Sequence, residues 1–391
     1  MNKDYFKKVL PILLSFFVMG FVDLVGIASN FVKKDLALSD SQANFIPSLL
    51  FVWFLVFSIP TGMLMNKIGR KKTVLLSLAV TSVSLLIPVF GCGYVQMLCA
   101  FSLLGIGNAI LQVSLNPLMS SVVPEDKIAS HLTFGQFVKA IASFLAPIIA
   151  SIAATAVIPQ FGLGWRVLFP IYLVVVLIAA LWLGLSNIED TPVEETSSFG
   201  ECFRLLAKPV IFLSFLGILC HVGIDVGINL TAPKLLVSKF GVVLEAAAYA
   251  TSVYFMFRTI GAFAGAFLLS KMTLRTFFIV SVVILLTSFV LMLAGTSETV
   301  LYVAFALAGL GNANIFSLVL SISFAYMPQK QNEVSSLMIM ALFGGTVFPM
   351  LMGFLSDRFG QGASVVVMIA GAVYLLLYAL KIKRKDSSKQ I

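Results

Sequence analysis

Residues 105–109 read GIGNA, and the same pattern returns at residues 309–313 as GLGNA. Each copy lies inside an apolar stretch that is long enough to cross a bilayer. Pro124 matches Pro328 at the same displacement of 204 residues, and Asp23 matches Asp225 at a displacement of 202. Because Gly-x-Gly-Asn-Ala is not a generic pattern for a helix that faces lipid, the repeat predicts two homologous halves with the same order of helices.

The composition is that of an integral membrane protein. Hydrophobic residues make up 60% of the 391 residues, charged residues make up 11%, and the mean hydropathy is +1.04. Soluble domains hold roughly 45–50% apolar and about 25% charged residues. A chain of this length has room for about twelve helices of ~20 residues each. We therefore expect an all-α integral membrane protein of twelve transmembrane helices in two pseudo-symmetric six-helix halves.

Polar or charged loops separate the expected membrane spans. The spans are 8–32, 43–65, 73–91, 95–122, 131–157, 165–185, 209–232, 245–269, 276–295, 298–326, 332–355 and 362–380. The longest polar interval divides them six and six. This division predicts an N-terminal half at 1–185, a cytoplasmic central loop at 186–208, and a C-terminal half with a basic cytoplasmic tail at 209–391.

Lysine and arginine are distributed unevenly over the loops. If both termini lie in the cytoplasm, the internal segments carry 18 of the 26 basic residues and the external loops carry 6. Cytoplasmic loops are the ones enriched in Lys and Arg, so we expect both termini inside. The net charge of +9 is then mostly a signal of topology. Because the basic residues are dispersed over short loops, we expect no nucleic-acid partner.

The sequence offers no set of residues for enzymatic or metal chemistry. Cys92, Cys99, Cys202 and Cys220 lack the spacing of metal ligands, and two histidines cannot build a His-rich site. A P-loop is absent from the sequence, which disfavours a pump driven by nucleotide hydrolysis. Ser, His and Asp are scattered over separate spans, so no nucleophile with its base can be assembled. We expect no enzymatic activity, no cofactor and no metal.

Polar side chains recur on one face of several expected spans. Asn108, Gln112 and Asn116 are each four residues apart, and four residues is about one helical turn. A spacing of three or four residues likewise places Gln136 with Lys139 and Ser143, His221 with Asp225 and Asn229, Tyr254 with Arg258, and Asn314 with Ser317 and Ser321 on one face. An ion at mid-helix in hydrocarbon is costly, at least ~2.5 kcal/mol, so such groups should face protein or water.

These stripes predict a central hydrophilic cavity that binds a polar solute. The candidate substrate-binding residues are Asn108, Gln112, Asn116, Gln136, Lys139, Asn229, Asn312 and Asn314. The alternative is that the amides hold neighbouring helices together within one half, as polar side chains do in membrane bundles.

The loop after the second span, residues 62–72, reads GMLMNKIGRKK. It resembles the Gly-x-x-x-Asp-Arg-x-Gly-Arg-Lys signature of the major facilitator superfamily, with Asn66 in place of the acid. Gly62 allows two helices to approach closely, Gly69 allows a tight turn, and Arg70 begins the cluster of cations that holds the loop in the cytoplasm. We expect Gly62, Asn66, Gly69 and Arg70 to serve in gating or structure. A second match at 353–360, GFLSDRFG, falls on the external side and is interpreted as a coincidence or a helix end.

Four further motifs are similar to the fucose/glucose-galactose permease branch of this superfamily, which comprises bacterial sugar:proton symporters. They are the Asn-x-x-x-Gln-x-x-x-Asn-Pro run at 108–117, FGQFVKA at 134–140, CHVGIDVGIN at 220–229 and FRTIGAF at 257–263. The resemblance implies a monomer in the bacterial cytoplasmic membrane that takes up a sugar or related solute together with protons by rocking of its two halves.

The chain departs from that branch where a proton would bind. The resemblance implies an Asp in the first span, which is Asp23, but it also implies a protonatable Glu where this chain has Gln112, and an Asn where it has Lys139. Asp23 is therefore the leading candidate for proton coupling, and Lys139 either pairs with Asp23 or binds an anionic substrate.

The seventh and eighth spans hold further candidates. His221 and Asp225 form a second possible titrating pair, and hydrogen-bonded helix packing is the alternative for them. Arg258 bonds either Asp225 or the backbone carbonyls of a broken helix, and we expect it to be structural. Two other functions are weighed: efflux of amphipathic drugs by proton antiport, and a membrane sensor that binds a solute without moving it.

Overall fold

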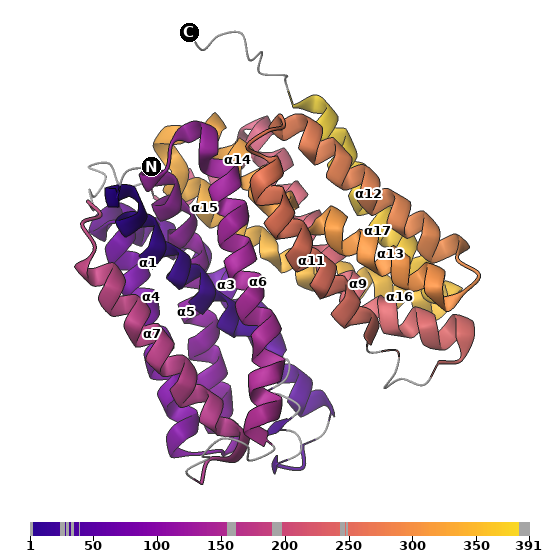
Figure 1. Cartoon of the computed structure of the whole chain (residues 1–391), viewed down its shortest axis with the longest axis horizontal. Coiled ribbons are helices and arrows are strands. Elements are labelled where there is room, and N and C mark those ends of the chain that lie inside the picture. Colours follow the sequence, from indigo (N-terminus) through magenta and orange to yellow (C-terminus); the bar gives the residue numbers. More distant parts are fainter. Residues whose placement is uncertain are drawn as a thin grey trace. The chain divides into compact units, whose positions relative to one another are not determined.

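The computed structural model describes residues 3–23, 40–154, 162–189, 198–242 and 249–382, together with residues 28, 31–32, 35–38 and 247. Regular secondary structure in this part of the chain is helical throughout, which confirms the predicted all-α fold (Figure 1). The helices form two compact units. Unit 1 comprises Met1–Lys208 and Phe324–Met340, and unit 2 comprises Pro209–Ser323 and Ala341–Ile391. A segment from the second half of the sequence thus packs in unit 1.

A helix covers at least part of every expected span. The elements before residue 208 are α1 (Lys3–Met19), η1 (Gly20–Asp23), α3 (Asp40–Ile68), α4 (Arg70–Phe90), α5 (Tyr94–Val122), η2 (Glu125–Lys127), α6 (Ile128–Ala154), η3 (Gly164–Val167), α7 (Leu168–Leu185), α8 (Phe199–Arg204) and η4 (Leu205–Ala207). The elements after it are α9 (Pro209–Phe240), α11 (Tyr249–Leu268), α12 (Leu274–Ala294), α13 (Glu298–Asn312), α14 (Ile315–Tyr326), η5 (Pro328–Lys330), α15 (Gln331–Met340), η6 (Ala341–Phe343), α16 (Gly344–Phe359) and α17 (Gln361–Lys381).

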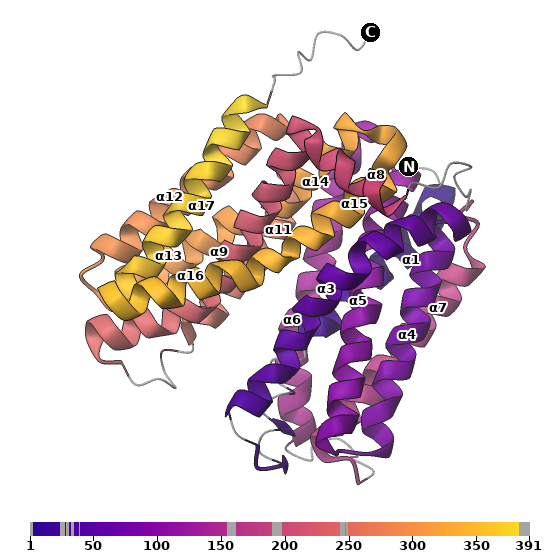
Figure 2. The ribbon, with the colours of Figure 1, turned by 180° about the vertical axis from the view of Figure 1, so that it is seen from behind.

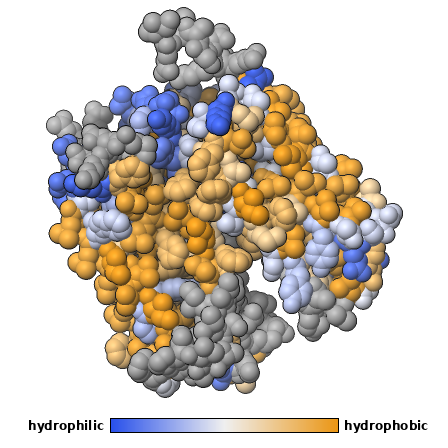
Figure 3. Space-filling view, in the orientation of Figure 1, coloured by the Kyte–Doolittle hydropathy of each residue, from blue (hydrophilic) through white to orange (hydrophobic). Residues whose placement is uncertain are grey.

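The surface of these helices is suited to lipid. Within the described ranges, nine helical stretches are long and apolar enough to cross a membrane. Large hydrophobic side chains remain exposed along them, as at Leu181 (66% exposed) and Leu185 (83% exposed) on α7. Hydrophobic residues cover much of the face in Figure 3, and hydrophilic residues gather on it near the N-terminus. Exposed apolar area on this scale is expected where lipid replaces water as the solvent.

The internal repeat is visible in the helix bounds. The displacement that relates the two GxGNA motifs also relates both ends of α4 to both ends of α12. It relates the start of α5 to the start of α13, and the end of α5 to the end of α14. The two copies of the span differ in one respect. Helix α5 is continuous, whereas its counterpart breaks between Asn312 and Ile315.

Glycines bring the repeated helices together in the same way in each unit. A Cβ atom built on Gly107 would lie 2.6 Å from Thr81 Oγ1 and 3.3 Å from the carbonyl oxygen of Ser77. In unit 2, a Cβ atom on Gly311 would lie 2.8 Å from the carbonyl oxygen of Ser281 and 2.7 Å from the backbone nitrogen of Leu285. Each residue of the first contact corresponds to one of the second at the displacement of the repeat. Small residues at such crossings let helix backbones approach closely in a membrane.

The other glycine of the motif repeats its contacts as well. Gly105 packs against Leu50 and Trp53, and Gly309 packs against the backbone of Tyr254 and the side chain of Phe257. Leu50 corresponds to Tyr254, and Trp53 to Phe257, at the same displacement. The motif that recurs in the sequence therefore marks two equivalent helix crossings in each unit.

The expected central loop contains a short helix. Ser198 is the N-cap of α8: its hydroxyl accepts a hydrogen bond from the backbone of Glu201 (3.3 Å), and its own backbone N–H donates to the Glu201 carboxylate (2.6 Å). These bonds lower the pKa of the Glu201 carboxyl. Figure 2 shows α8 beside α15, inside unit 1. The Ser-x-x-Glu pattern is a capping box, and it is readable in the sequence.

We expect Gly311→Ala to lower the melting temperature of the purified protein in detergent, because the new methyl group would meet backbone atoms of α12 that only a shift of the helix can relieve. Overpacking of this kind costs about 1–3 kcal/mol. The matched control is Gly353→Ala on α16, where nothing lies within 4 Å of a built Cβ atom. There alanine should leave the melting temperature unchanged or raise it, since alanine is the better helix former by about 1 kcal/mol. Equal shifts for the two variants would contradict the close approach.

Candidate functional site

A polar network lies in unit 2 at the middle of α9. Asp225 is the sixteenth residue after Pro209, where α9 begins, and the helix has 32 residues. His221 lies one turn earlier on the same face and is buried. At 1.5 Å per residue, Asp225 is about 24 Å along the helix, which is far from either end. The apolar helix α9 therefore places an ionisable group, the Asp225 carboxyl, at the middle of its length.

Asn312, the last residue of α13, joins the groups of this network. Its Oδ1 atom contacts His221 Nδ1 at 2.9 Å. Its Nδ2 atom donates to the hydroxyl of Tyr254 at 2.9 Å and to Asp225 Oδ1 at 3.4 Å. Because the amide group of Asn312 is used for donation on one side, its oxygen must accept on the other, so His221 carries its proton on Nδ1 in this arrangement.

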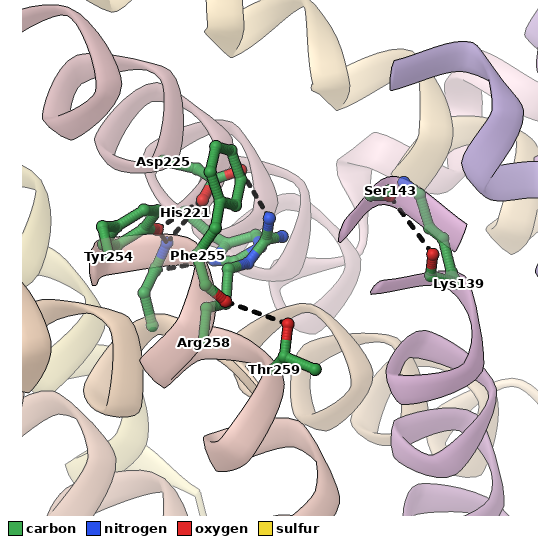
Figure 4. A network of polar contacts seen from close by, with 9 residues as sticks. Lys139, Ser143, His221, Asp225, Tyr254, Phe255, Arg258 and Thr259 are labelled. Carbon is green, nitrogen blue, oxygen red and sulfur yellow. Dashed lines mark hydrogen bonds and ion pairs between the residues drawn. The ribbon is translucent and has the colours of Figure 1, made fainter. Parts of the chain in front are cut away.

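Asp225 is held by three donors. The hydroxyl of Tyr254 donates to Oδ1 alongside Asn312, and Nη1 of Arg258 lies 3.2 Å from Oδ2. The side chains of Arg258 and Asp225 are 29% and 16% exposed. Figure 4 shows Tyr254 and Arg258 converging on Asp225 from one helix. Of the two partners expected for Arg258, the structure shows Asp225.

The backbone explains why these side chains meet. Tyr254 and Arg258 lie one turn apart on α11, and Gly309 of α13 packs directly against their backbones. A Cβ atom at Gly309 would collide with the Tyr254 carbonyl oxygen and would lie 2.8 Å from the Arg258 nitrogen. The helix break after Asn312 ends α13 at this crossing. The network is thus built where the repeated glycine motif brings α13 against α11.

Two of the predicted substrate ligands of unit 2 lie outside the network's hydrogen bonds. Asn314 is buried and donates to the carbonyl oxygen of Gly261 at 3.0 Å, which ties the start of α14 to α11. Its Oδ1 atom, like that of Asn229, is buried and has no partner among the described residues. A substrate-binding role for Asn314 and Asn229 stays a prediction.

The amide stripe of α5 is internally bonded except at the Oδ1 atom of Asn116, which is buried and has no partner among the described residues. Asn108 donates to the carbonyl oxygen of Met19 (2.9 Å), Gln112 donates to Asn108 Oδ1 (2.7 Å), and Asn116 donates to the carbonyl oxygen of Gln112 (2.6 Å). All three side chains are buried. In this structure the stripe ties α5 to α1 and to itself, as the packing alternative expects. Solute binding by these three residues stays a prediction.

The remaining candidates of unit 1 lie on α6 and η1. Gln136 and Lys139 are partly buried on α6. The backbone of Asp23 ends η1, and its side chain lies outside the described residues. Gly20 of η1 packs against the Lys139 backbone, so the two elements cross at this point.

A second polar cluster in unit 1 joins α3 to α15. Asn66 donates to Glu333 Oε1 at 2.8 Å, and Asn332 donates to Asn66 Oδ1 at 2.7 Å. Arg70 donates from Nε to Asn332 Oδ1 at 2.8 Å and from Nη1 to the carbonyl oxygen of Pro117 at 3.1 Å. Glu333 is 5% exposed. Its position near the start of an expected span is the only signal in the sequence that could have marked it.

The two glycines of this loop have the geometry expected of them. A Cβ atom at Gly62 would collide with Ser336 Oγ, so α3 and α15 are in direct contact. Gly69 alone separates α3 from α4 and has a φ of 92°, a value that favours glycine. Gly360, in the second match to the signature, has a φ of 79° and ends α16. That match is therefore a helix end, as one of its two interpretations expected.

Comparison with known proteins identifies relatives over nearly the whole chain. A family model of the Major Facilitator Superfamily matches residues 12–341 and 215–391. The glucose/galactose transporter of Brucella abortus biovar 1 (strain 9-941) is 23% identical over 399 residues, covering 97% of this chain and 95% of the relative. The hexuronate transporter of Bacillus subtilis (strain 168) is 24% identical over 413 residues, covering the same shares. Among solved structures, a variant of the E. coli fucose:proton symporter FucP matches with a TM-score of 0.82 at 18% identity, covering 97% of this chain and 99% of that one. At this identity the likeness is one of fold.

We expect Arg258→Gln to lower the melting temperature in detergent, because it leaves the Asp225 carboxylate without its cation. Breaking a buried ion pair costs about 3–5 kcal/mol, and the lower end applies here since both side chains keep some exposure. The double variant Asp225→Asn/Arg258→Gln should recover at least half of that loss, because no unpaired charge remains. A double variant no more stable than the single one would show that the pair is not what stabilises this crossing.

We expect Asn66→Asp to destabilise the contact between α3 and α15, because a second carboxylate would then face Glu333 where an amide now donates to it. Adding Glu333→Gln should restore the donor–acceptor match and the melting temperature with it. Glu333→Gln alone serves as the control and should cost less than Asn66→Asp alone. If Asn66→Asp melts like the wild type, charge repulsion does not explain why this chain has an amide where the superfamily signature has an acid.

Proposed function

The chain belongs to the Major Facilitator Superfamily, and from this premise we propose that it takes up a sugar or sugar-like solute together with protons by alternating access. In this proposal it is a monomer in the bacterial cytoplasmic membrane with both termini in the cytoplasm. The solute and the proton bind near the middle of the membrane, and rocking of the two halves of the sequence exposes the site to each side in turn.

The polar network around Asp225 is the observation that carries this proposal. Asp225 and Arg258 lie at mid-depth of their helices and are partly exposed. Exposure of an ion to lipid at this depth would cost at least ~2.5 kcal/mol, whereas exposure to a water-filled path costs little. The network is therefore a site for a polar solute on an aqueous route through unit 2.

The chemistry of the network suits a sugar. Its imidazole, phenol, amide and guanidinium groups donate and accept hydrogen bonds in a fixed arrangement, and sugar hydroxyls do both. A site of this kind rejects solutes without hydroxyls, since its buried polar groups would then be left unpaired. The names of the glucose/galactose, hexuronate and fucose:proton relatives support the same class of substrate.

Asp23 is the residue that we propose carries the proton. Protonation of Asp225 would leave the positive charge of Arg258 unpaired inside the membrane. Asp225 is therefore better suited to a constant ion pair than to binding and releasing the transported proton. Asp23 is the only carboxylate within the expected spans of the first half of the sequence. His221 is the second candidate, because its imidazole reaches Asp225 through Asn312.

We expect proteoliposomes that contain the wild-type protein to accumulate a sugar when the outside is more acidic than the inside. Asp23→Asn imitates the protonated acid, so it should still exchange labelled for unlabelled sugar but should not accumulate it against a gradient. Both are measured as uptake of radiolabelled neutral hexoses, deoxy-sugars, amino sugars and sugar acids, with and without the imposed pH gradient.

Asp225→Asn is the matched control, since it removes the counterpart of Asp23 in the other half. It should impair sugar binding without producing the uncoupled exchange expected of Asp23→Asn. Uncoupled exchange by Asp225→Asn alone would move the proton site to the network. Accumulation that follows a sodium gradient would refute proton coupling, export of amphipathic drugs without sugar uptake would refute the substrate class, and binding without any transport would favour a sensor.

A further inference from the structure

Lys139 differs from two other lysines of the chain, Lys71 and Lys239, in what its charge meets. Lys71 Nζ donates to the carbonyl oxygens of Gly184 and Ser186 at 3.1 and 2.8 Å. Lys239 Nζ donates to those of Met292 and Leu293 at 2.9 and 2.8 Å. Both lysines therefore cap the carboxyl end of a helix, where the helix dipole favours a cation.

The Lys139 ammonium has no such partner among the described residues. The part of the chain that the structure describes holds no acceptor within hydrogen-bonding distance of its Nζ atom. Lys139 is the eleventh residue after Ile128, where α6 begins, and so lies about 16 Å along the helix at 1.5 Å per residue. Its side chain is partly buried. A cation at this depth needs water or an anion beside it.

The backbone of Lys139 is firmly placed. Its carbonyl oxygen accepts a hydrogen bond from Ser143 Oγ at 3.2 Å, one turn along the helix (Figure 4). A Cβ atom at Gly20 would lie only 2.5 Å from the same carbonyl oxygen, so η1 crosses α6 at this residue. The ammonium is thus presented by a fixed backbone through a flexible stem, which suits a residue that takes and releases a ligand.

Among the described residues of unit 2, the charged side chains at mid-helix are paired with each other. The Asp225 carboxylate is already matched by Arg258 at 3.2 Å. Among the described ionisable side chains at mid-helix, Lys139 therefore adds one positive charge that is not balanced. In the function proposed above, Asp23 is neutral when it carries the proton, so it does not balance Lys139 in the loaded state.

We propose that the transported solute is a sugar acid and that Lys139 binds its carboxylate. This inference rests on the proposed function and deepens it by giving the charge of the substrate. Gln136 lies three residues before Lys139 on the same face of α6, where its amide can bond the hydroxyls next to the carboxylate. In the loaded carrier Lys139 is positive, the bound carboxylate is negative and Asp23 is neutral. These charges sum to zero, as they do in the empty carrier, where Lys139 is positive and the deprotonated Asp23 is negative.

The proposal determines how transport responds to voltage. One proton that enters with one sugar carboxylate moves no net charge, so a membrane potential should not drive uptake. One proton that enters with a neutral sugar moves one positive charge, and a potential of 100 mV would then support about fifty-fold accumulation. A pH gradient drives both.

We therefore expect wild-type proteoliposomes to take up galacturonate or glucuronate in preference to galactose or glucose, with a KM at least about tenfold lower, which corresponds to 1.4 kcal/mol. A pH gradient should drive this uptake, and a potassium diffusion potential set with valinomycin should leave it unchanged. Lys139→Gln should raise the KM for the acid at least about tenfold, and Lys139→Arg should retain most of the affinity. Lys127→Gln is the matched control, because it removes a charge from the exposed residue just before α6, and it should change the KM less than twofold.

The outcomes separate this inference from the proposed function. Uptake of neutral sugars alone, driven by the potential, would overturn the inference and leave sugar:proton symport standing. Full galacturonate affinity in Lys139→Gln would overturn the role of Lys139. Absence of uptake for any sugar under a pH gradient would overturn the proposed function itself. If Lys139→Gln does not yield folded protein, the substrate preference and voltage response of the wild type still decide the charge of the substrate.

Discussion

Hydrocarbon offers no hydrogen-bonding partners, and this constraint decides where polar groups stand in the molecule. Each polar side chain within a membrane helix must find a partner in the protein or face water. The amide nitrogens of Asn108, Gln112 and Asn116 meet this demand by donating to Met19, to Asn108 and to the backbone of Gln112, whereas the Oδ1 atom of Asn116 is buried without a partner among the described residues. Asp225 meets it with three donors from neighbouring helices. Lys139 is a described charged group for which water or a ligand must serve, and the buried Oδ1 atoms of Asn229 and Asn314 also have no partner among the described residues.

Close helix crossings make those partnerships possible. Gly309 lets α13 approach α11 closely enough for Asn312, Tyr254 and Asp225 to share hydrogen bonds. Gly62 does the same for α3 and α15, beside the bonds between Asn66 and Glu333. Without a hydrophobic driving force between helices in lipid, dispersion contacts and such hydrogen bonds are what hold the bundle together. Close packing and polar bonds therefore occur at the same helix crossings.

The two halves of the sequence share the same glycine helix crossings but differ in the hydrogen bonds that are made beside them. Gly107 and Gly311 make equivalent contacts, but Asn108 bonds the backbone of α1 while Asn312 bonds His221, Tyr254 and Asp225. Helix α5 stays continuous, whereas its counterpart breaks after Asn312. A shared scaffold with different polar residues gives unit 2 a balanced ion pair, and gives unit 1 a cation on α6 that has no partner among the described residues. A carrier that binds an asymmetric solute needs such a difference between its halves.

The sequence by itself determined that the protein lies in a lipid bilayer, that it is all-helical, and approximately where most helices begin and end, because these follow from local composition. It also determined the duplication, because one motif is repeated at a constant spacing. It also identified the polar faces, since residues four apart lie on one side of a helix. It did not identify what each face meets. Asp225 and Asn116 carry equally clear signals in the sequence, yet one joins an ion pair across helices and the other bonds its own helix. Glu333 gained its importance only from Asn66, which lies 267 residues away. Partners across helices depend on the rotation and depth of each neighbour, and those are decided only when the whole bundle packs.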